Sequence, residues 1–124
     1  MKKSIASLVM MAPFAWACGA SVPPPTQPMA DAQAAERSAA ELGANNEPSA
    51  QLSLKLAQDQ IEMARKAMAD GDNKRAEALL LRAKADAELA VAQAREKNAK
   101  GEGQKAAEDA AAQKATNVGQ GAVK

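Results

Sequence analysis

Two helices and the turn between them are predicted by residues 49–98, which read SAQLSLKLAQDQIEMARKAMADGDNKRAEALLLRAKADAELAVAQAREKN. In the first half, large apolar residues recur every seven positions, with alanine three residues after the first two, which is the spacing of an a/d stripe on one helix face. The stripe consists of Leu54, Ile61 and Met68 with Ala57 and Ala64. Gly71 is expected to end this helix and Asp72 to cap the next, so the pattern predicts an antiparallel helical hairpin.

The second helix of the hairpin, from Asn73 to about Asn98, carries a seam that is mostly alanine. Its members are Ala76, Leu80, Ala83, Ala87, Ala90 and Ala94, at spacings of four and three, and the charged residues stay off it. Alanine allows two helix backbones to approach closely. We therefore expect the large side chains of the first helix to pack into an alanine groove on the second.

The same region, Leu54 to about Asn98, resembles an uncharacterised family of bacterial envelope lipoproteins, the domain-of-unknown-function family 4398. The segments that carry the resemblance are Ala64-Arg65-Lys66-Ala67, Gly71-Asp72, Arg75-Ala76-Glu77 and Asp86-Ala87-Glu88-Leu89-Ala90. The resemblance implies a short helical hairpin behind a lipoprotein signal, and members are sometimes joined to an OmpA-like peptidoglycan-binding domain. It implies no activity, because none is established for the family.

On either side of the hairpin the sequence predicts one more helix and two non-helical segments. Residues 29–42 are alanine-rich, with Gly43 as the residue that ends the helix and Pro48 in the first turn of the next. Residues 18–28 contain four prolines and predict a disordered linker. Residues 99–124 contain glycine and alanine, with no large apolar residue in the alanine-rich stretch 104–115, and we expect a flexible tail. The prediction is an all-α chain, either an antiparallel hairpin or a small three-helix arrangement over residues 29–98.

Residues 1–17 have the features of an export signal. Lys2 and Lys3 form a positive start, and Ile5 to Ala17 is apolar or small and too short to span a bilayer. The stretch Ala15-Trp16-Ala17-Cys18 resembles a bacterial lipobox, in which the cysteine becomes the lipidated first residue of the mature chain. We expect lipidation at Cys18, because a lone cysteine at the cleavage point has no other evident use.

Two further inferences concern the cell envelope. In Gram-negative lipoproteins an aspartate after the cysteine commonly signals retention in the inner membrane, so Gly19 indicates the outer membrane, with the domain facing the periplasm. Ala15-x-Ala17 is also an ordinary cleavage site, which leaves a soluble periplasmic helical protein as an alternative.

Composition argues against most chemistry. The chain has no histidine or tyrosine, and its only aromatic residues, Phe14 and Trp16, lie within the predicted signal. The mature chain would therefore lack the commonest general acid/base, the commonest metal ligand and every stacking platform. Acidic and basic residues nearly balance, which argues against nucleic acid as a partner. We expect no enzymatic activity, no cofactor and no metal site.

The small number of large apolar residues predicts strong helicity with weak tertiary stability, or further burial through an envelope partner or self-association. Five apolar residues lie off the main seams, and we expect them to pack against the first helix rather than to form an oligomer face: Leu56, Met63, Leu81, Leu89 and Val91.

Three functions remain open from the sequence. The first is a lipid-anchored scaffold or adaptor in the envelope. The second is a tether joined to peptidoglycan through Lys124, because the terminal lysine and alanine-rich helix resemble the major outer-membrane lipoprotein, although that protein ends Tyr-Arg-Lys and this chain ends Ala122-Val123-Lys124. The third is an enzyme, which the composition disfavours.

Overall fold

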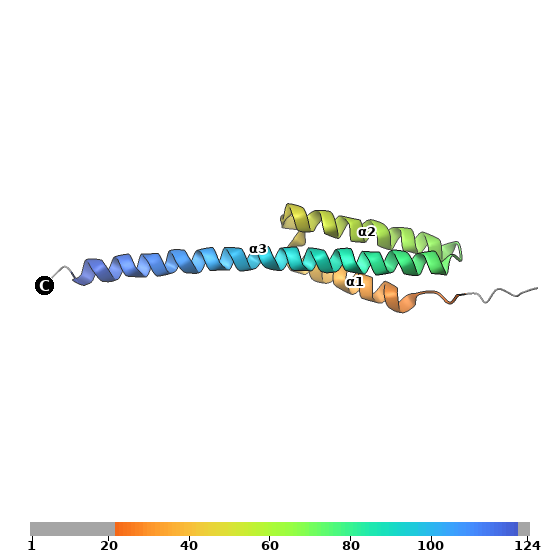
Figure 1. Cartoon of the computed structure of the whole chain (residues 1–124), viewed down its shortest axis with the longest axis horizontal. Helices are drawn as coiled ribbons and strands as arrows, with labels where there is room; N and C mark the ends of the chain where they lie inside the picture. The colour runs from red at the N-terminus through yellow and green to blue at the C-terminus, as the bar shows by residue number, and fades with distance from the viewer. Residues whose placement is uncertain (1–21, 122–124) are drawn as a thin grey trace, which may run out of the picture.

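The structure is a computed structural model, and it describes residues 22–121. Three α-helices account for nearly all of this part: α1 (Thr26–Glu41), α2 (Pro48–Ala69) and α3 (Asn73–Gly121), with a short 3-10 helix η1 (Ala44–Asn46) between the first two. α1 and α2 both lie along the N-terminal half of α3, and the C-terminal half of α3 projects alone from the bundle (Figure 1). The prediction of an all-α, three-helix arrangement is confirmed.

The turns follow from the residues predicted to make them. Gly43, which follows the C-cap Leu42 of α1, has φ of +85°, and Gly71, which follows the C-cap Asp70 of α2, has φ of +77°. Both values lie in the left-handed region that favours glycine. Pro48 is the first residue of α2, where its missing N–H leaves no helical hydrogen bond unmade. The backbone N–H of Arg75 donates to the Asp72 carboxylate at 3.2 Å, so Asp72 caps α3 as predicted.

Both outer boundaries differ from the prediction. α1 begins at Thr26 and not at Met29, so Pro28 lies inside the helix. It is tolerated there because the first N–H groups of a helix have no partner within the helix. α3 does not end near Asn98 but continues to Gly121. Gly101 and Gly103 lower the helix propensity without breaking the helix, since a glycine in an alanine-rich helix costs about 1 kcal/mol and forces no change of direction.

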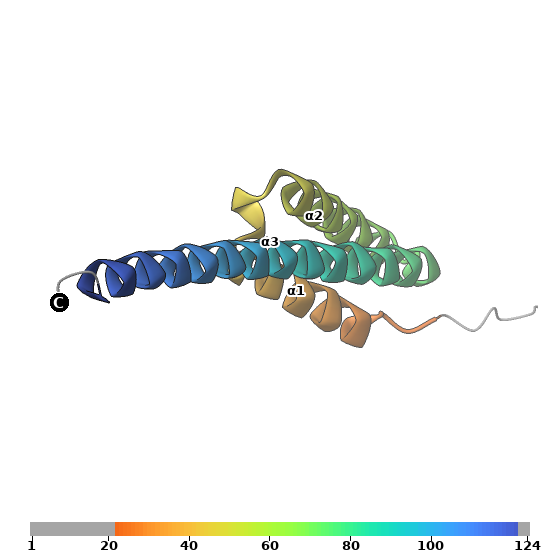
Figure 2. The same ribbon diagram turned by 60° about the vertical axis from the view of Figure 1, so that its left-hand side comes forward.

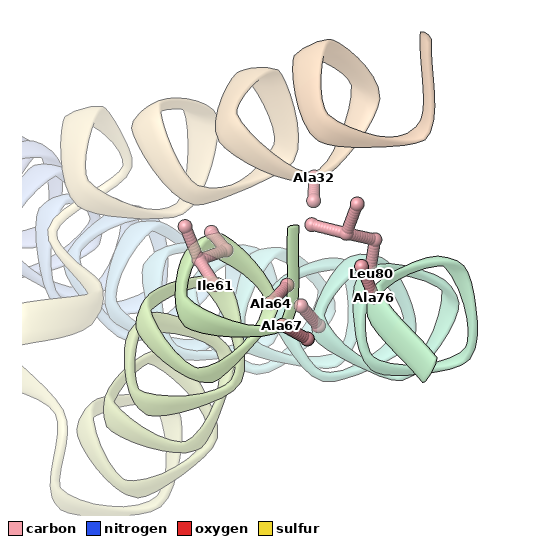
Figure 3. Packing of buried hydrophobic residues seen from close by; sticks show 7 residues of the cluster. Ala32, Ile61, Ala64, Ala67, Ala76 and Leu80 are labelled. Carbon is pink, nitrogen blue, oxygen red and sulfur yellow. The ribbon is translucent and has the colours of Figure 1, made fainter. Parts of the chain in front are cut away.

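Small side chains make up most of the core, which consists of two adjoining clusters. Figure 3 shows the first, where Leu80 of α3 points toward Ala32 of α1 while Ile61 and Ala64 approach from α2. The second lies nearer η1 and centres on Leu54, with Ala39 and Ala90 against it. Within residues 22–121, only Leu54, Ile61 and Leu80 are both large and fully enclosed. The predicted stripe and seam therefore do face each other, and α1 adds only alanines to the fully buried set.

Two polar pairs cross the interface between α2 and α3. The Ser53 hydroxyl donates to Gln93 Oε1 at 3.0 Å, and Gln60 Nε2 donates to Asp86 Oδ2 at 2.6 Å. An alanine groove alone would fit several sliding positions of one helix along the other. These pairs select one of them, because a shift would leave partly buried polar groups without partners.

The prediction for the off-seam apolar residues is wrong for four of the five. Val91 is partly buried and packs against the second cluster. Leu56, Met63, Leu81 and Leu89 are exposed by between 43% and 59% and do not pack against α1. The reason is that the fully buried contacts of α1 are the alanines Ala32 and Ala39, with Met29 partly buried beside them. The helix therefore covers a narrow strip and leaves the other sides of the α2–α3 pair open.

Candidate functional site

The N-terminal segment leaves the bundle beside the turn between α2 and α3. Asn73 Nδ2, in the first turn of α3, donates a hydrogen bond of 2.7 Å to the backbone carbonyl of Val22. The chain then enters α1 through Pro23, Pro24 and Pro25, and the Thr26 N–H bonds the Pro24 carbonyl at 2.9 Å. Val22 therefore lies at this end of the bundle.

The opposite end of the bundle is where α3 loses its neighbours. Asn98 Nδ2 donates to the Leu42 carbonyl at 3.2 Å and so satisfies a backbone group at the end of α1. Lys97 lies 3.7 Å from a carboxylate oxygen of Glu47, at the start of α2. Beyond Asn98, every residue of α3 whose exposure the structure describes, through Val118, is exposed. We call residues 99–121 the arm.

An ion pair marks the junction between the bundle and the arm. Lys100 Nζ donates to Glu96 Oε1 at 2.5 Å, one turn apart on α3. The hydrogen bond from Lys100, and then its charge, lower the pKa of Glu96. The same hydrogen bond and the Glu96 charge raise the pKa of Lys100. Both groups are fully exposed, so the pair supports local helix and builds no reactive site.

The rod that results has its two ends far apart. α3 contains 49 residues, so it is about 73 Å long at about 1.5 Å per residue. Its first turn holds the N-terminal segment, and its last residues form the opposite tip (Figures 1 and 2). α3 therefore separates Val22 from Gly121 by roughly its full length.

One hollow of the described surface lies between α1 and α2. It has a volume of about 330 Å³ and is lined mainly by charged and amide side chains. Its polar groups already pair with one another: Gln58 donates to Glu36 at 3.0 Å, and Arg65 bonds Glu62. Within residues 22–121, no group of three or more acidic, histidine or cysteine side chains is placed to hold a metal ion.

The two residues singled out from the sequence, Cys18 for lipidation and Lys124 for cell-wall linkage, lie outside the described residues. None of the helices in the described part is both long and apolar enough to cross a bilayer. Sequence reasoning missed the two asparagines that fasten the ends of the bundle, Asn73 and Asn98. The available signal was a short amide side chain in an otherwise strongly helix-forming stretch, where it usually weakens the helix unless it bonds elsewhere.

Comparison with family models finds a match to "Domain of unknown function (DUF4398)" over residues 27–118. This range is about three-quarters of the chain. The chain belongs to the DUF4398 family. The match begins near the start of α1 and ends near the tip of α3, so the DUF4398 domain comprises all three helices and most of the arm, well beyond the stretch that suggested the family from sequence. No curated protein and no solved structure matches the chain.

Proposed function

We propose that this DUF4398 protein is a lipid-anchored rod of the bacterial cell envelope that acts as a structural or adaptor module. The observation that carries the proposal is the placement of the two ends. Cys18 precedes Val22 by only four residues, and Val22 is bonded to the first turn of α3. A lipid on Cys18 would hold the α2–α3 turn close to the membrane, and α3 would carry the arm away from it.

The properties of the described helices support a mechanical rather than a chemical role. The surface carries ion pairs of mixed sign, most of them within one helix and exposed. Such pairs stabilise a helix by a few tenths of a kcal/mol each and provide no strong field for an ionic substrate. The arm presents alanine and charged residues over about six turns of exposed helix, which is suited to contact with another envelope component.

The test is metabolic labelling with a fatty-acid analogue, followed by separation of membrane and soluble fractions. The wild-type chain is expected to carry the label and to remain with the outer membrane. The Cys18→Ser chain is expected to lose both label and membrane association, while keeping its helical circular dichroism. An unlabelled wild-type protein in the soluble periplasmic fraction would replace this proposal with the soluble alternative.

A second candidate function is a covalent tether to peptidoglycan through Lys124. It is favoured by one observation, namely that α3 ends at Gly121, at the tip farthest from Val22. Sacculi boiled in detergent are expected to retain the wild-type chain and to release a Lys124→Arg chain, because arginine keeps the charge without the primary amine. Complete release of the wild type would exclude the tether and leave the anchored rod intact.

A further inference from the structure

One face of the α2–α3 pair is left uncovered by α1. Gln58 of α2 and Lys84 of α3 mark the side toward α1, because each contacts a carboxylate of that helix. At about 100° per residue, Leu56 lies about 160° around α2 from Gln58, and Leu89 lies about 140° around α3 from Lys84. We call the side away from α1 the outer face. It carries Leu52, Leu56 and Met63 of α2 and Leu89 of α3.

These four apolar side chains lie on the same side of the α2–α3 pair. The three on α2 fall within about 40° of one another around the helix axis. Their exposed fractions are 63% for Leu52, 45% for Leu56 and 43% for Met63, and that of Leu89 is 48%. About half of each side chain is therefore already packed on its own hairpin, and the other half is in water. A small protein gains by covering such side chains.

The polar pairs fix how these side chains are arranged. Ser53 bonds Gln93, and Gln60 bonds Asp86, so position 56 of α2 lies opposite position 90 of α3. Leu56 and Leu89 are consequently about one residue apart in height. Leu56 and Leu89 each lie about 40–60° around their helix from the polar residues that bond across the interface. Both are displaced from those residues toward the side away from α1. The two leucines thus flank the row of polar pairs symmetrically.

We propose that the outer face binds a second copy of this chain in a parallel, two-fold symmetric dimer. With the symmetry axis along the rod, each α2 lies over α3 of the other copy at the same height, and the two hairpins form a four-helix bundle. Every pair of neighbouring helices is then antiparallel, as in up-and-down bundles. Leu56 of each copy meets Leu89 of the other, so four leucines fill one layer.

One pair of opposite charges on the outer face fits a second copy. Near the α2–α3 turn, Asp70 and Arg75 line one hollow of about 230 Å³ together with Met63. The register places Asp70 and Arg75 at nearly the same height, one on each helix. In the parallel dimer Asp70 of one copy therefore faces Arg75 of the other, and the symmetry repeats this pair of opposite charges.

The area available is sufficient for a specific interface. α2 has 22 residues and is about 33 Å long, and two helices side by side are about 20 Å wide. The outer face then offers roughly 650 Å² per copy, or about 1,300 Å² in total, which is at the lower end of the range for specific protein–protein interfaces. Leu81 takes no part, because it lies about 80° around α3 from Leu89.

The dimer is compatible with the proposed function but does not depend on it. A parallel dimer keeps both N-terminal segments at the same end, as two anchors in one membrane require. An antiparallel dimer would place them at opposite ends of the rod. Because the outer face itself drives association, the Cys18→Ser chain is expected to dimerise as well, so loss of the anchor and loss of the dimer are separate results.

Disulfide trapping in intact cells tests the arrangement. Full-length Leu56→Cys and Leu89→Cys chains, carrying different tags, are expressed together, and a mixed disulfide is expected. The control pair is Glu62→Cys with Glu88→Cys, two exposed positions about 40° from the α1-facing side of their helices, which should not crosslink. The wild-type chain, whose single cysteine is Cys18, measures the crosslinking that occurs without an introduced cysteine.

Sedimentation of the purified full-length chain in detergent provides the second measurement. The wild type is expected to be a dimer. A chain with Leu56→Glu and Leu89→Glu should dissociate at least roughly tenfold more readily with unchanged helicity, because both side chains are half exposed in one copy. A monomeric wild type would overturn the proposal. So would a disulfide between Leu52→Cys and Met63→Cys chains, which indicates an antiparallel pair, or capture of Leu89→Cys by a different envelope protein.

Discussion

Replacing Leu80 with alanine is expected to remove a large share of the stability of the bundle. Leu80 is fully buried and is one of three large side chains enclosed in the described part of the chain. Truncation of a buried leucine to alanine costs about 2–5 kcal/mol, because the neighbouring side chains fill the cavity only in part. A bundle of this size has a total stability of roughly 4–11 kcal/mol. The neighbours of Leu80 on the seam of α3, such as Ala76 and Ala83, are too small to fill the cavity that the substitution leaves.

Leu81→Ala is the matched control, since Leu81 follows directly in α3 and is 59% exposed. Its stability should change by no more than about 0.5 kcal/mol. Urea and thermal unfolding of both full-length variants, followed by circular dichroism, measures the difference. The midpoint of thermal unfolding should fall by at least about 10 °C for Leu80→Ala alone. Equal losses for the two variants would refute the deduced packing of α3 against α1 and α2.

Three further predictions concern backbone, packing and charge. Gly71→Ala should destabilise the chain by about 1 kcal/mol, because φ at this position is +77°. Gly101→Ala should stabilise the arm by about 1 kcal/mol, because Gly101 is an exposed helical position with open space around it. The unfolding curves of the two variants should therefore move in opposite directions. Ala83→Leu should cost at least about 1–3 kcal/mol, because it forces apart helices that meet at a fully buried alanine, and Ala85→Leu, on an exposed side, should unfold like the wild type. The pKa of Glu96 is lowered by Lys100, so the pair should stabilise the helix above the ordinary glutamate pKa, and this contribution should be lost as the pH falls through the lowered pKa. Titration of the carboxyl groups by NMR measures the pKa of Glu96. An ordinary or raised value would contradict its pairing with Lys100.

Much of the bundle could be predicted because its sequence signals are local. The seven-residue spacing of Leu54 and Ile61, the glycine at position 71 and the proline at position 48 each specify a helix face or a helix end through the chemistry of one or two residues. These signals correctly placed the hairpin turn and the side on which the helices meet. They could not give the register, which depends on polar pairs between residues 40 and 26 positions apart in the chain.

The errors arose where one helix meets, or fails to meet, another. Whether Leu56 or Leu89 is covered depends on how wide a strip α1 protects, and alanines at its contacts make that strip narrow. The continuation of α3 past Asn98 does not follow from the sequence pattern, because Gly101 and Gly103 indicate a break while the alanines around them favour helix strongly enough to continue it. The candidate sites were identified from motifs alone, at Cys18 and Lys124, and remain predictions.

The most direct test of the anchored rod is the intact mass of the protein purified from cell envelopes. The anchored protein should begin at residue 18 and carry additional mass equal to a diacylglyceryl group on the Cys18 sulfur and an acyl group on its amine. Its thiol should then be unreactive toward a maleimide. An unmodified chain with a thiol that reacts would contradict the account.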